Sequence, residues 1–397
     1  MKSVIVQKFG GVCLESPEKI KQVAASAAGL ARDGHGVVLV VSAMGKTTDQ
    51  LVKLAYEVSP TPNRRELDML LTTGERISMA LMGMALTDLG CRAISFTGSQ
   101  AGVMTDGSHS NARIIDIRPI RIQEELARGS VIVLAGFQGV NPDTKEITTL
   151  GRGGTDTTAV AMAAKLGAIR CDIVKEVDGV CTADPRLVSE ARAIPKLTYA
   201  SLREMCFWGA KVLHYRSVEL AEQTQVPLFI RRWGTQDRVT QVVKEDLTME
   251  LCQILSVNSH SRLEHLEVTA ANLNQAFLLF EKHLTTKSLP RPQILESTFE
   301  QGRTRLVLTG DGELLDSLIK SIDGVAIKNL KKTLSSVTVT CHGSLGTDLA
   351  ARVMNCLETD GIAVDKVLFT PLSVSVCVDP HRREDTIRSL HKLIERK

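Results

Sequence analysis

Tryptophan and tyrosine are scarce in this chain, with 2 and 3 residues among 397. Because stacked aromatic side chains are the usual platform for single-stranded nucleic acid, composition argues against that partner. The formal net charge is only +3, which gives no reason to expect a nucleic-acid or membrane-surface partner. No run approaches the roughly 20 apolar residues of a membrane span, and the N-terminus lacks a signal-peptide pattern. We therefore expect a cytoplasmic protein that binds neither nucleic acid nor membrane.

Motifs for metal and dinucleotide binding are also missing. The 9 cysteines are scattered, without a CxxC pair or Cys/His ligand spacing, so we expect reduced packing thiols and no dedicated metal site. The glycines that follow the first strand match neither GxGxxG nor the P-loop pattern GxxxxGK[ST]. The sequence therefore lacks the main motif that would support hydride transfer with a dinucleotide cofactor.

The residues that are present describe a soluble α/β protein of two or three domains. Hydrophobic residues make up 43% of the chain, and 397 residues are too many for one ordinary core. Apolar runs at 4–6, 37–41, 131–135 and 173–177 predict strands. Helices are predicted at 17–32 and at 65–89, the second interrupted at 72–74. This alternation predicts a mainly parallel sheet covered on both faces, with ligands at the carboxyl ends of its strands.

The stretch 148–158, TTLGRGGTDTT, combines several means of binding anions. Its glycines run into a predicted helix, and a helix that opens on a glycine turn favours an anion at its N-terminus. Arg152 can grip a carboxylate with two hydrogen bonds, and Asp156 can hold a cation. The alternative is a glycine-rich turn with a Thr or Asp cap before a structural helix.

Other polar segments follow predicted strands or interrupt apolar runs. Lys8 precedes Gly10 and Gly11, whose N–H groups could line a phosphate; a strand-end lysine before a tight turn is the alternative. Ser42 and Glu75 stand at the edges of apolar runs, where each could also be only a helix cap. The segment 175–186 ends in Asp-Gly and Asp-Pro turn pairs and could also be a solvated loop.

Six segments in this order and spacing resemble the aspartate kinases of the amino acid kinase family, over essentially residues 2–235. They are SAMG from Ser42, GERIS from Gly74, GFQG from Gly136, GRGGTD from Gly151, DGVCTADPR from Asp178 and GAKVLH from Gly209. The resemblance implies an α/β, three-layer sandwich with a mainly parallel central sheet. It also implies transfer of the γ-phosphoryl group of ATP to the side-chain carboxylate of L-aspartate, the first step toward lysine, threonine, methionine and diaminopimelate.

That reaction needs no general base, because a carboxylate with a pKa near 4 is already ionised at neutral pH. Repulsion between two anions is the obstacle, and positioning with positive charge is the remedy. The resemblance implies a catalytic role for Lys8, Arg152 and Asp156, and an aspartate pocket formed by Ser42, Thr48, Glu75, Arg152 and Asp156. It further implies nucleotide contacts from Lys8, Gly10, Gly11, Lys175, Glu176, Cys181, Asp184, Arg186 and Lys211. Mg²⁺ is expected on the ATP, held by phosphates and water.

Several residues depart from the family pattern. Val12 and Cys13 replace Thr and Ser after the two glycines, and Lys175 and Glu176 stand where the family commonly has Thr and Asp. Cys181 replaces a tyrosine beside the nucleotide, and Tyr215 replaces the proline after His214. These departures leave open a non-catalytic regulator that binds a nucleotide or an amino acid. A kinase for a related acidic substrate is a second alternative.

The organisation of the chain changes near residue 245. Strands at 335–341, 363–367 and 372–378 and helices at 345–359 and 383–395 resemble an ACT module, the α+β, ferredoxin-like fold that aspartate kinases carry in tandem. We expect a kinase domain over 1–245 and paired ACT-like domains over 246–397. One copy, about 262–330, is inserted into the other, about 250–260 plus 332–397. The altered turns at 271–274 and 341–346 leave effector binding open, and paired modules of this kind imply a homodimer.

Overall fold

The computed structural model describes residues 3–235, 239–244, 253–287, 289, 291–310, 312–322, 324, 326–343 and 346–394. The chain forms two compact units. Unit 1 comprises Met1–Cys181, Ala193–Cys206 and Lys211–Leu247, and unit 2 comprises Thr182–Arg192, Phe207–Ala210 and Thr248–Lys397. None of the helices described has the length and apolar character needed to cross a bilayer.

An eight-stranded sheet in the order β10-β12-β11-β9-β1-β2-β6-β3 forms the centre of unit 1. Its pairs are parallel except β11 with β12. The strands are β1 (Val4–Phe9), β2 (Gly36–Val41), β3 (Ala93–Phe96), β6 (Val131–Ala135), β9 (Arg170–Lys175), β10 (Lys196–Thr198), β11 (Leu228–Arg232) and β12 (Val239–Val243). Every residue of β2 and β6 is buried, as continuous apolar runs predict for strands covered on both faces.

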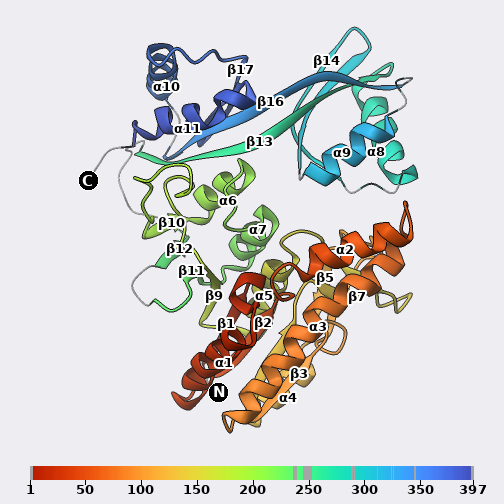
Figure 1. Cartoon of the computed structure of the whole chain (residues 1–397), viewed down its shortest axis with the longest axis vertical. Helices are drawn as coiled ribbons and strands as arrows, with labels where there is room; N and C mark the ends of the chain where they lie inside the picture. The colour runs from red at the N-terminus through yellow and green to blue at the C-terminus, as the bar shows by residue number, and fades with distance from the viewer. Residues whose placement is uncertain are drawn as a thin grey trace. The chain divides into compact units, whose positions relative to one another are not determined.

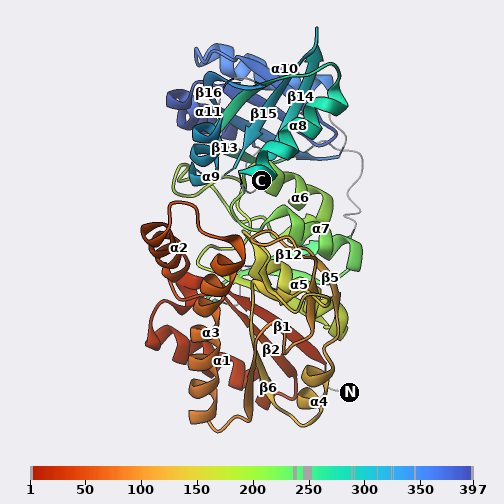
Figure 2. The same ribbon diagram turned by 90° about the vertical axis from the view of Figure 1, so that its right-hand side faces the viewer.

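Helices cover both faces of this sheet (Figure 2). On one face, α1 (Pro17–Arg32) and α3 (Arg64–Asp88) pack against side chains of β1, β2 and β6, among them Phe9, Leu39 and Val133. On the other face, α5 (Gly154–Leu166) contacts β1, β2 and β9. The remaining helices are η1 (Gly11–Leu14), α2 (Thr47–Val58), α4 (Ile120–Ala127), α6 (Tyr199–Phe207) and α7 (Tyr215–Thr224). The expected three-layer sandwich is confirmed.

A second, four-stranded sheet of unit 1 has the order β5-β4-β7-β8. Its strands are β4 (Val103–Thr105), β5 (Ile114–Ile117), β7 (Gln138–Val140) and β8 (Ile147–Thr149). Because β8 ends just before Gly151, this small sheet fixes where the glycine turn into α5 begins.

Unit 2 is built on one antiparallel sheet in the order β14-β15-β13-β16-β18-β17. Its strands are β13 (Gln253–Thr269), β14 (Gln293–Glu300), β15 (Arg303–Thr309), β16 (Ile327–His342), β17 (Lys366–Thr370) and β18 (Ser373–Val378). The helices α8 (Leu273–Thr286) and α9 (Gly312–Ser321) pack near one end of this sheet, and η2 (Pro380–Arg382), α10 (Thr347–Thr359) and α11 (Arg383–His391) lie near the other (Figure 1). Two β-α-β-β-α repeats therefore share the long strands β13 and β16, which confirms the expected α+β fold.

The shared strands agree with the nested arrangement that the sequence predicts. The first part of β13, through His260, pairs with 336–342 of β16, and its later part pairs with β15. The cluster around Leu349 and Leu390 forms the core of the later repeat, and the cluster around Phe280 and Leu318 forms that of the inserted one. Residues 182–192 and 207–210 fall within the kinase domain predicted at 1–245, but in the structure they group with unit 2. The domain boundaries themselves stay a prediction.

Several element boundaries differ from the sequence-based prediction. Lys8 lies within β1 rather than after it, and β9 ends at Lys175, before Val177. The strand predicted at 363–367 is shifted to Lys366–Thr370, and the helix predicted from 345 begins at Thr347. The last helix, predicted at 383–395, ends at His391. Residue 395 lies outside the described part of the chain, as do residues 344 and 345 of the predicted 341–346 turn.

The predicted interruption of the second helix at 72–74 is wrong, because α3 is continuous. The hydroxyls of Thr72 and Thr73 donate to the carbonyls of Met69 and Leu70, at 3.0 and 2.7 Å. Gly74 serves packing rather than chain breaking, since a Cβ there would lie 2.8 Å from the Cβ of Ala43. This close contact holds α3 against the loop that follows β2.

We expect Gly74→Ala to lower the free energy of unfolding by about 1–3 kcal/mol, because the added methyl group overpacks the contact with Ala43. Gly83→Ala is the matched control in the same helix, where the new Cβ would have its nearest neighbour at 4.0 Å. That change should be neutral or stabilise by up to about 1 kcal/mol, as Ala does in helices. Urea unfolding of the two variants measures the difference, and equal midpoints would contradict the packing role of Gly74.

Candidate active site

A buried ion pair joins two layers of unit 1. Lys8 on β1 places its Nζ 2.8 Å from Oδ1 of Asp156 in the first turn of α5, and the two side chains are 8% and 6% exposed. The Nζ of Lys175, at the end of β9, lies 3.9 Å from Oδ2 of Asp156. Two of the predicted site lysines thus converge on one predicted site carboxylate at the carboxyl end of the sheet.

Charge compensation controls the protonation of this cluster. Burial opposes ionisation of Asp156, but Lys8 and Lys175 outweigh it, and the pKa of that carboxyl is lowered. Burial, together with the neighbouring Lys8, lowers the pKa of Lys175, although Asp156 opposes this. Two cations around one anion leave an excess of positive charge, which suits the approach of a second anion.

The turn before α5 is built from glycines that no other residue could replace without strain. Gly151 and Gly153 have φ angles of 73° and 72°, in the left-handed region that favours glycine. A Cβ on Gly153 would also overlap the side chain of His214. The N-terminus of α5, with the exposed Arg152 beside it, therefore presents backbone N–H groups and a guanidinium in one short stretch.

Glu75 lies inside α3 rather than at a helix cap, so the cap alternative is wrong for this residue. It is 3% exposed, and its Oε1 accepts a hydrogen bond from the N–H of Ala43 at 3.1 Å. Its Oε2 is buried and has no hydrogen-bond partner among the residues described. Burial, which the hydrogen bond from Ala43 only partly offsets, raises the pKa of Glu75 to about 7. A buried carboxylate oxygen without a partner is equipped to receive a cationic ligand.

The loops after β1 and β2 are held together next to these groups. The N–H of Ser42 donates to the carbonyl of Phe9 at 3.1 Å, and that of Gly45 donates to the carbonyl of Gly11 at 2.9 Å. A Cβ on Gly11 would lie 2.7 Å from the carbonyl oxygen of Ala43, so only glycine fits there. A Cβ on Gly10 would lie 3.5 Å from Nζ of Lys8. The two loops thus lie against each other, next to Lys8 and Glu75.

Other predicted site residues take different positions. Thr48 lies in the first turn of α2, and the exposed Lys211 precedes α7. Glu176 pairs with Lys19, Oε1 to Nζ at 3.3 Å, and Cys181 forms a β-bridge with Ala193. Asp184 and Arg186 belong to unit 2 and pair with each other at 2.6 Å.

The sequence analysis missed Asp68, a fully buried carboxylate on α3. It accepts hydrogen bonds from the hydroxyl of Thr149 at 2.6 Å, the Nδ1–H of His109 at 2.7 Å and the N–H of Ser110 at 3.1 Å. Ser110 in turn borders Gly151, where a Cβ would lie 3.0 Å from the Ser110 carbonyl oxygen. Asp68 therefore anchors both chain segments that flank the glycine turn. A lone aspartate within an apolar helical stretch was the only signal in the sequence.

Two further residues support the same turn from α7. The guanidinium of Arg216 donates to Asn111 Oδ1 at 3.0 Å, to the Leu150 carbonyl at 3.2 Å and to the Ala112 carbonyl at 3.0 Å. His214 caps α7 by accepting the N–H of Arg216 at 3.3 Å. Burial first, and the charge of Arg216 second, lower the pKa of His214 to about 4. A neutral imidazole therefore packs against Gly153 at neutral pH.

No resident metal centre is evident in the described part of the chain, since it contains no group of three or more His, Cys, Asp or Glu that could hold an ion. The polar groups of the site are instead lysines, carboxylates and a glycine-opened helix. Such a set binds and positions anionic ligands by charge and backbone N–H groups.

Charged side chains and a glycine-opened helix at the carboxyl ends of the strands form an arrangement that can bind and position phosphate groups. A sequence model of the amino acid kinase family matches residues 3–232, and this chain belongs to that family. Within it, the similar proteins are aspartokinases. The Mycolicibacterium smegmatis aspartokinase is 49% identical over 407 residues, covering 98% of this chain and 96% of that protein.

Two further comparisons agree. The Mycobacterium tuberculosis aspartokinase is 51% identical over 264 residues, an alignment that spans 66% of this chain and 62% of that protein. The crystal structure of Escherichia coli aspartokinase III, in complex with aspartate and ADP, aligns with a TM-score of 0.79 at 21% identity. It covers 98% of this chain and 99% of that one. At this identity the likeness establishes the fold.

We expect Asp68→Ala to lower the free energy of unfolding by about 3 kcal/mol or more, because three donors lose their buried acceptor. Asp88→Ala is the control, since Asp88 is the exposed last residue of the same helix. A carboxylate at a helix C-terminus opposes the helix dipole, so its removal should change stability by less than about 0.5 kcal/mol. Urea unfolding checks both, and a similar small effect for Asp68→Ala would contradict the anchoring role.

The raised pKa of Glu75 predicts a pH dependence of stability. Between its ordinary value of 4.5 and about 7, the unfolded chain ionises at this residue while the folded protein keeps the proton. The contribution to stability is therefore complete below pH 4.5 and is lost as pH rises to about 7, with a total on the order of 3 kcal/mol.

Glu75→Gln should remove this slope, and Glu66→Gln, at an exposed site in the same helix, should preserve it. Urea unfolding at pH 5 and pH 8 provides the measurement. An unchanged slope in Glu75→Gln would show that Glu75 ionises normally in the folded protein.

Proposed function

We propose that this protein transfers the γ-phosphoryl group of ATP to the side-chain carboxylate of L-aspartate and forms 4-phospho-L-aspartate. The observation that carries the proposal is the buried Lys8–Asp156 pair at the glycine-opened N-terminus of α5, with Lys175 supplying a second cation. The names of the full-length relatives support aspartate as the acceptor. The product would be the first intermediate toward lysine, threonine and methionine.

In the proposed reaction, a lone pair of the aspartate carboxylate attacks the γ-phosphorus and the bond to the β–γ bridging oxygen breaks, so that ADP leaves. No side chain has to remove a proton, because the acceptor is already ionised. Lys8 would shift from Asp156 toward the transferring phosphoryl group and reduce the repulsion between the two anions. Lys175 would remain to balance the charge of Asp156.

The nucleotide would lie on the glycine side of the site. Gly10 and Gly11 would donate N–H groups to the phosphates, and Mg²⁺ would bind chiefly to phosphate oxygens and water. Contacts from Glu176, Cys181, Asp184, Arg186 and Lys211 are carried over from the resemblance, as part of this proposal. Adenine nucleotide as the donor is supported by the ADP bound in the E. coli neighbour.

The aspartate would lie between Arg152 and Glu75. Arg152 would bind the α-carboxylate with two hydrogen bonds, while Glu75 and Asp156 would hold the ammonium group, and Ser42 and Thr48 would complete the pocket. The buried Oε2 of Glu75, which has no hydrogen-bond partner among the described residues, supports this assignment. Because an ammonium ion stabilises the ionised carboxylate, Glu75 would lose its proton as the substrate binds.

The C-terminal repeats are proposed to be tandem ACT-like domains that hold two copies of the chain together as a homodimer. Shared strands in one sheet support the nested-repeat part of this proposal. A cytoplasmic location is proposed with it, as the site of amino-acid biosynthesis.

The proposed activity is tested by incubating the protein with Mg-ATP, L-aspartate and hydroxylamine, which converts an acyl phosphate to a hydroxamate. We expect hydroxamate with aspartate and none with L-glutamate or without substrate. Product with glutamate alone would indicate a related acidic substrate. No product from folded protein that binds ATP would indicate the regulatory alternative, to which Val12 and Cys13 point.

Lys8→Met should lower kcat by about 10²–10³-fold, the typical loss when one electrostatic donor to a transition state is removed. Lys165→Met is the control, because the exposed Lys165 lies on α5 but pairs with Asp116 at 2.8 Å. Turnover in the hydroxamate assay, with circular dichroism to confirm folding, separates the two. Normal turnover in Lys8→Met would remove Lys8 from the reaction.

A further inference from the structure

Arg216 is a cation in an electrostatically unfavourable position. It lies in the first turn of α7, where the helix dipole opposes a positive charge. Its side chain is half-buried, and burial first and the charge of Arg113 second lower its pKa. Among the residues described, no carboxylate lies within ion-pair distance of it, since Asp106 and Glu219 act only from farther away. Withdrawing a cation from water without a paired carboxylate is costly.

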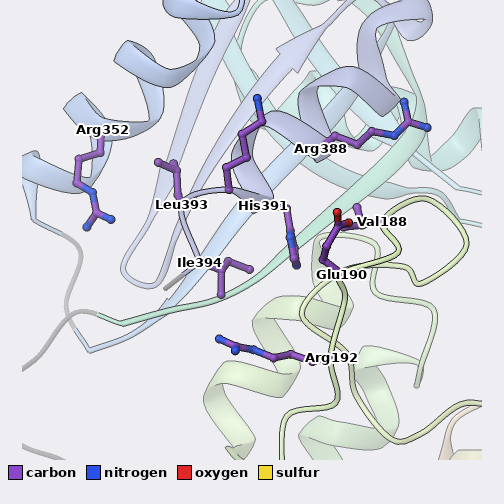
Figure 3. Close-up of a pocket in the computed structure, with 9 residues that line it drawn as sticks. Val188, Glu190, Arg192, Arg352, Arg388, His391, Leu393 and Ile394 are labelled. Atoms are coloured by element: carbon purple, nitrogen blue, oxygen red, sulfur yellow. The ribbon is translucent and has the colours of Figure 1, made fainter. Parts of the chain in front are cut away.

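Arg388 shows the more usual arrangement of a helical arginine. It borders the cavity of unit 2 that Figure 3 shows, in the last turn of α11, where the helix dipole favours a cation. It also pairs with Glu384, Nη2 to Oε2, at 3.0 Å and with Asp385, Nη1 to Oδ1, at 3.5 Å. Local electrostatics explain Arg388 but not Arg216. A residue kept against its local electrostatics indicates that its contacts serve function.

The guanidinium of Arg216 joins two segments of unit 1. On one side it donates to Oδ1 of Asn111 and to the carbonyl of Ala112, both at 3.0 Å. On the other side it donates to the carbonyl of Leu150 at 3.2 Å. A Cβ on Gly151 would lie 3.2 Å from Oδ1 of Asn111, so the segment that Arg216 binds packs directly against the first glycine of the turn. The planar fork of arginine can reach several acceptors at once.

The start of α7 thus holds the glycine turn on both sides of Arg152. Just before Arg152, the carbonyl of Leu150 is bound by Arg216. Just after it, Gly153 packs against the side chain of His214 at the start of α7. Because α7 also packs beside α5 (Figure 1), these contacts fix the backbone from which the side chain of Arg152 extends.

We propose that Arg216 is a positioning residue, which presets the glycine turn so that Arg152 can bind the α-carboxylate of L-aspartate. This inference rests on the proposed function, which assigns that contact to Arg152. Arg216 acts through the backbone of the turn and not by contact with the substrate. A turn that is ordered before the substrate arrives does not have to be ordered during binding, so the affinity for aspartate is higher.

The nucleotide side of the site should not depend on Arg216. Gly10 and Gly11, proposed to bind the phosphates, follow β1, and Gly11 is held by the N–H of Gly45. None of the hydrogen bonds of the Arg216 guanidinium reaches these loops. The proposal therefore predicts a loss of affinity for aspartate without a loss of affinity for the nucleotide, a separation that general destabilisation of the protein would not produce.

Isothermal titration calorimetry of the full chain, with Mg-ADP alone and with L-aspartate in the presence of Mg-ADP, tests this separation. Arg216→Gln should weaken aspartate binding about tenfold or more, because a displaced turn misplaces Arg152. Its affinity for ADP should change less than about twofold, as expected of an independent site. Arg216→Lys keeps the charge but reaches fewer acceptors, and should weaken aspartate binding less. Circular dichroism confirms that each variant is folded.

Arg203→Gln is the matched control. Arg203 is exposed on α6 and pairs with Glu222 of α7, so this change removes a guanidinium that contacts the same helix away from the glycine turn. Both affinities should stay within about twofold of those of the unaltered protein. A loss of aspartate affinity in Arg203→Gln equal to that in Arg216→Gln would assign the effect to the docking of α7 as a whole and would overturn the proposal.

The hydroxamate assay of the unaltered protein separates this inference from the proposed function. If that protein binds L-aspartate but forms no hydroxamate, the proposed function fails, while a selective loss of binding in Arg216→Gln still supports the positioning role. If hydroxamate forms and Arg216→Gln binds aspartate normally, or loses aspartate and ADP affinity equally, the positioning role alone is overturned. Unaltered protein that binds no L-aspartate up to about 10 mM would overturn both.

Discussion

The site depends on the cost of burying the carboxylate of Asp156 in the first turn of α5. An isolated charge there would be strongly destabilising, so Lys8 must lie against it and Lys175 must remain close. This requirement fixes β1, β9 and α5 relative to one another at the carboxyl end of the sheet. It also keeps an excess cation where a phosphoryl group would arrive, so the compensation that stabilises the fold prepares the site for an anion.

Close backbone contacts give this arrangement its precision. Gly11 and Gly74 both approach Ala43, and Gly153 approaches His214, at distances that leave no room for a side chain. The loops after β1 and β2 therefore cannot shift independently of each other, and the turn before α5 cannot shift independently of His214 at the start of α7. Asp68 adds hydrogen bonds on the far side of that turn. Catalysis by positioning needs such rigidity, because small displacements of the reacting groups are costly.

Local patterns in the sequence predicted much of the fold. The apolar runs at 37–41 and 131–135 and the helix that begins at Pro17 were predicted correctly, because burial on both faces and helix-start signals are local properties. The convergence of Lys8 on Asp156 required the family resemblance, since 148 positions separate them in the sequence (156 − 8). Asp68 and His109 could not be paired from sequence, because a buried carboxylate finds its donors through tertiary contacts. The interruption predicted at 72–74 failed because packing against Ala43, rather than chain breaking, calls for Gly74.

The fate of the aspartate oxygen atoms tests the central claim most directly. L-aspartate labelled with ¹⁸O in its carboxylates would be incubated with Mg-ATP and hydroxylamine, and the released phosphate analysed by mass spectrometry. If the carboxylate attacks the γ-phosphorus, hydroxylamine then cleaves the acyl C–O bond, and each phosphate carries one ¹⁸O atom from aspartate. Phosphate without ¹⁸O, formed at the same rate, would show that the protein hydrolyses ATP and would contradict phosphoryl transfer to aspartate.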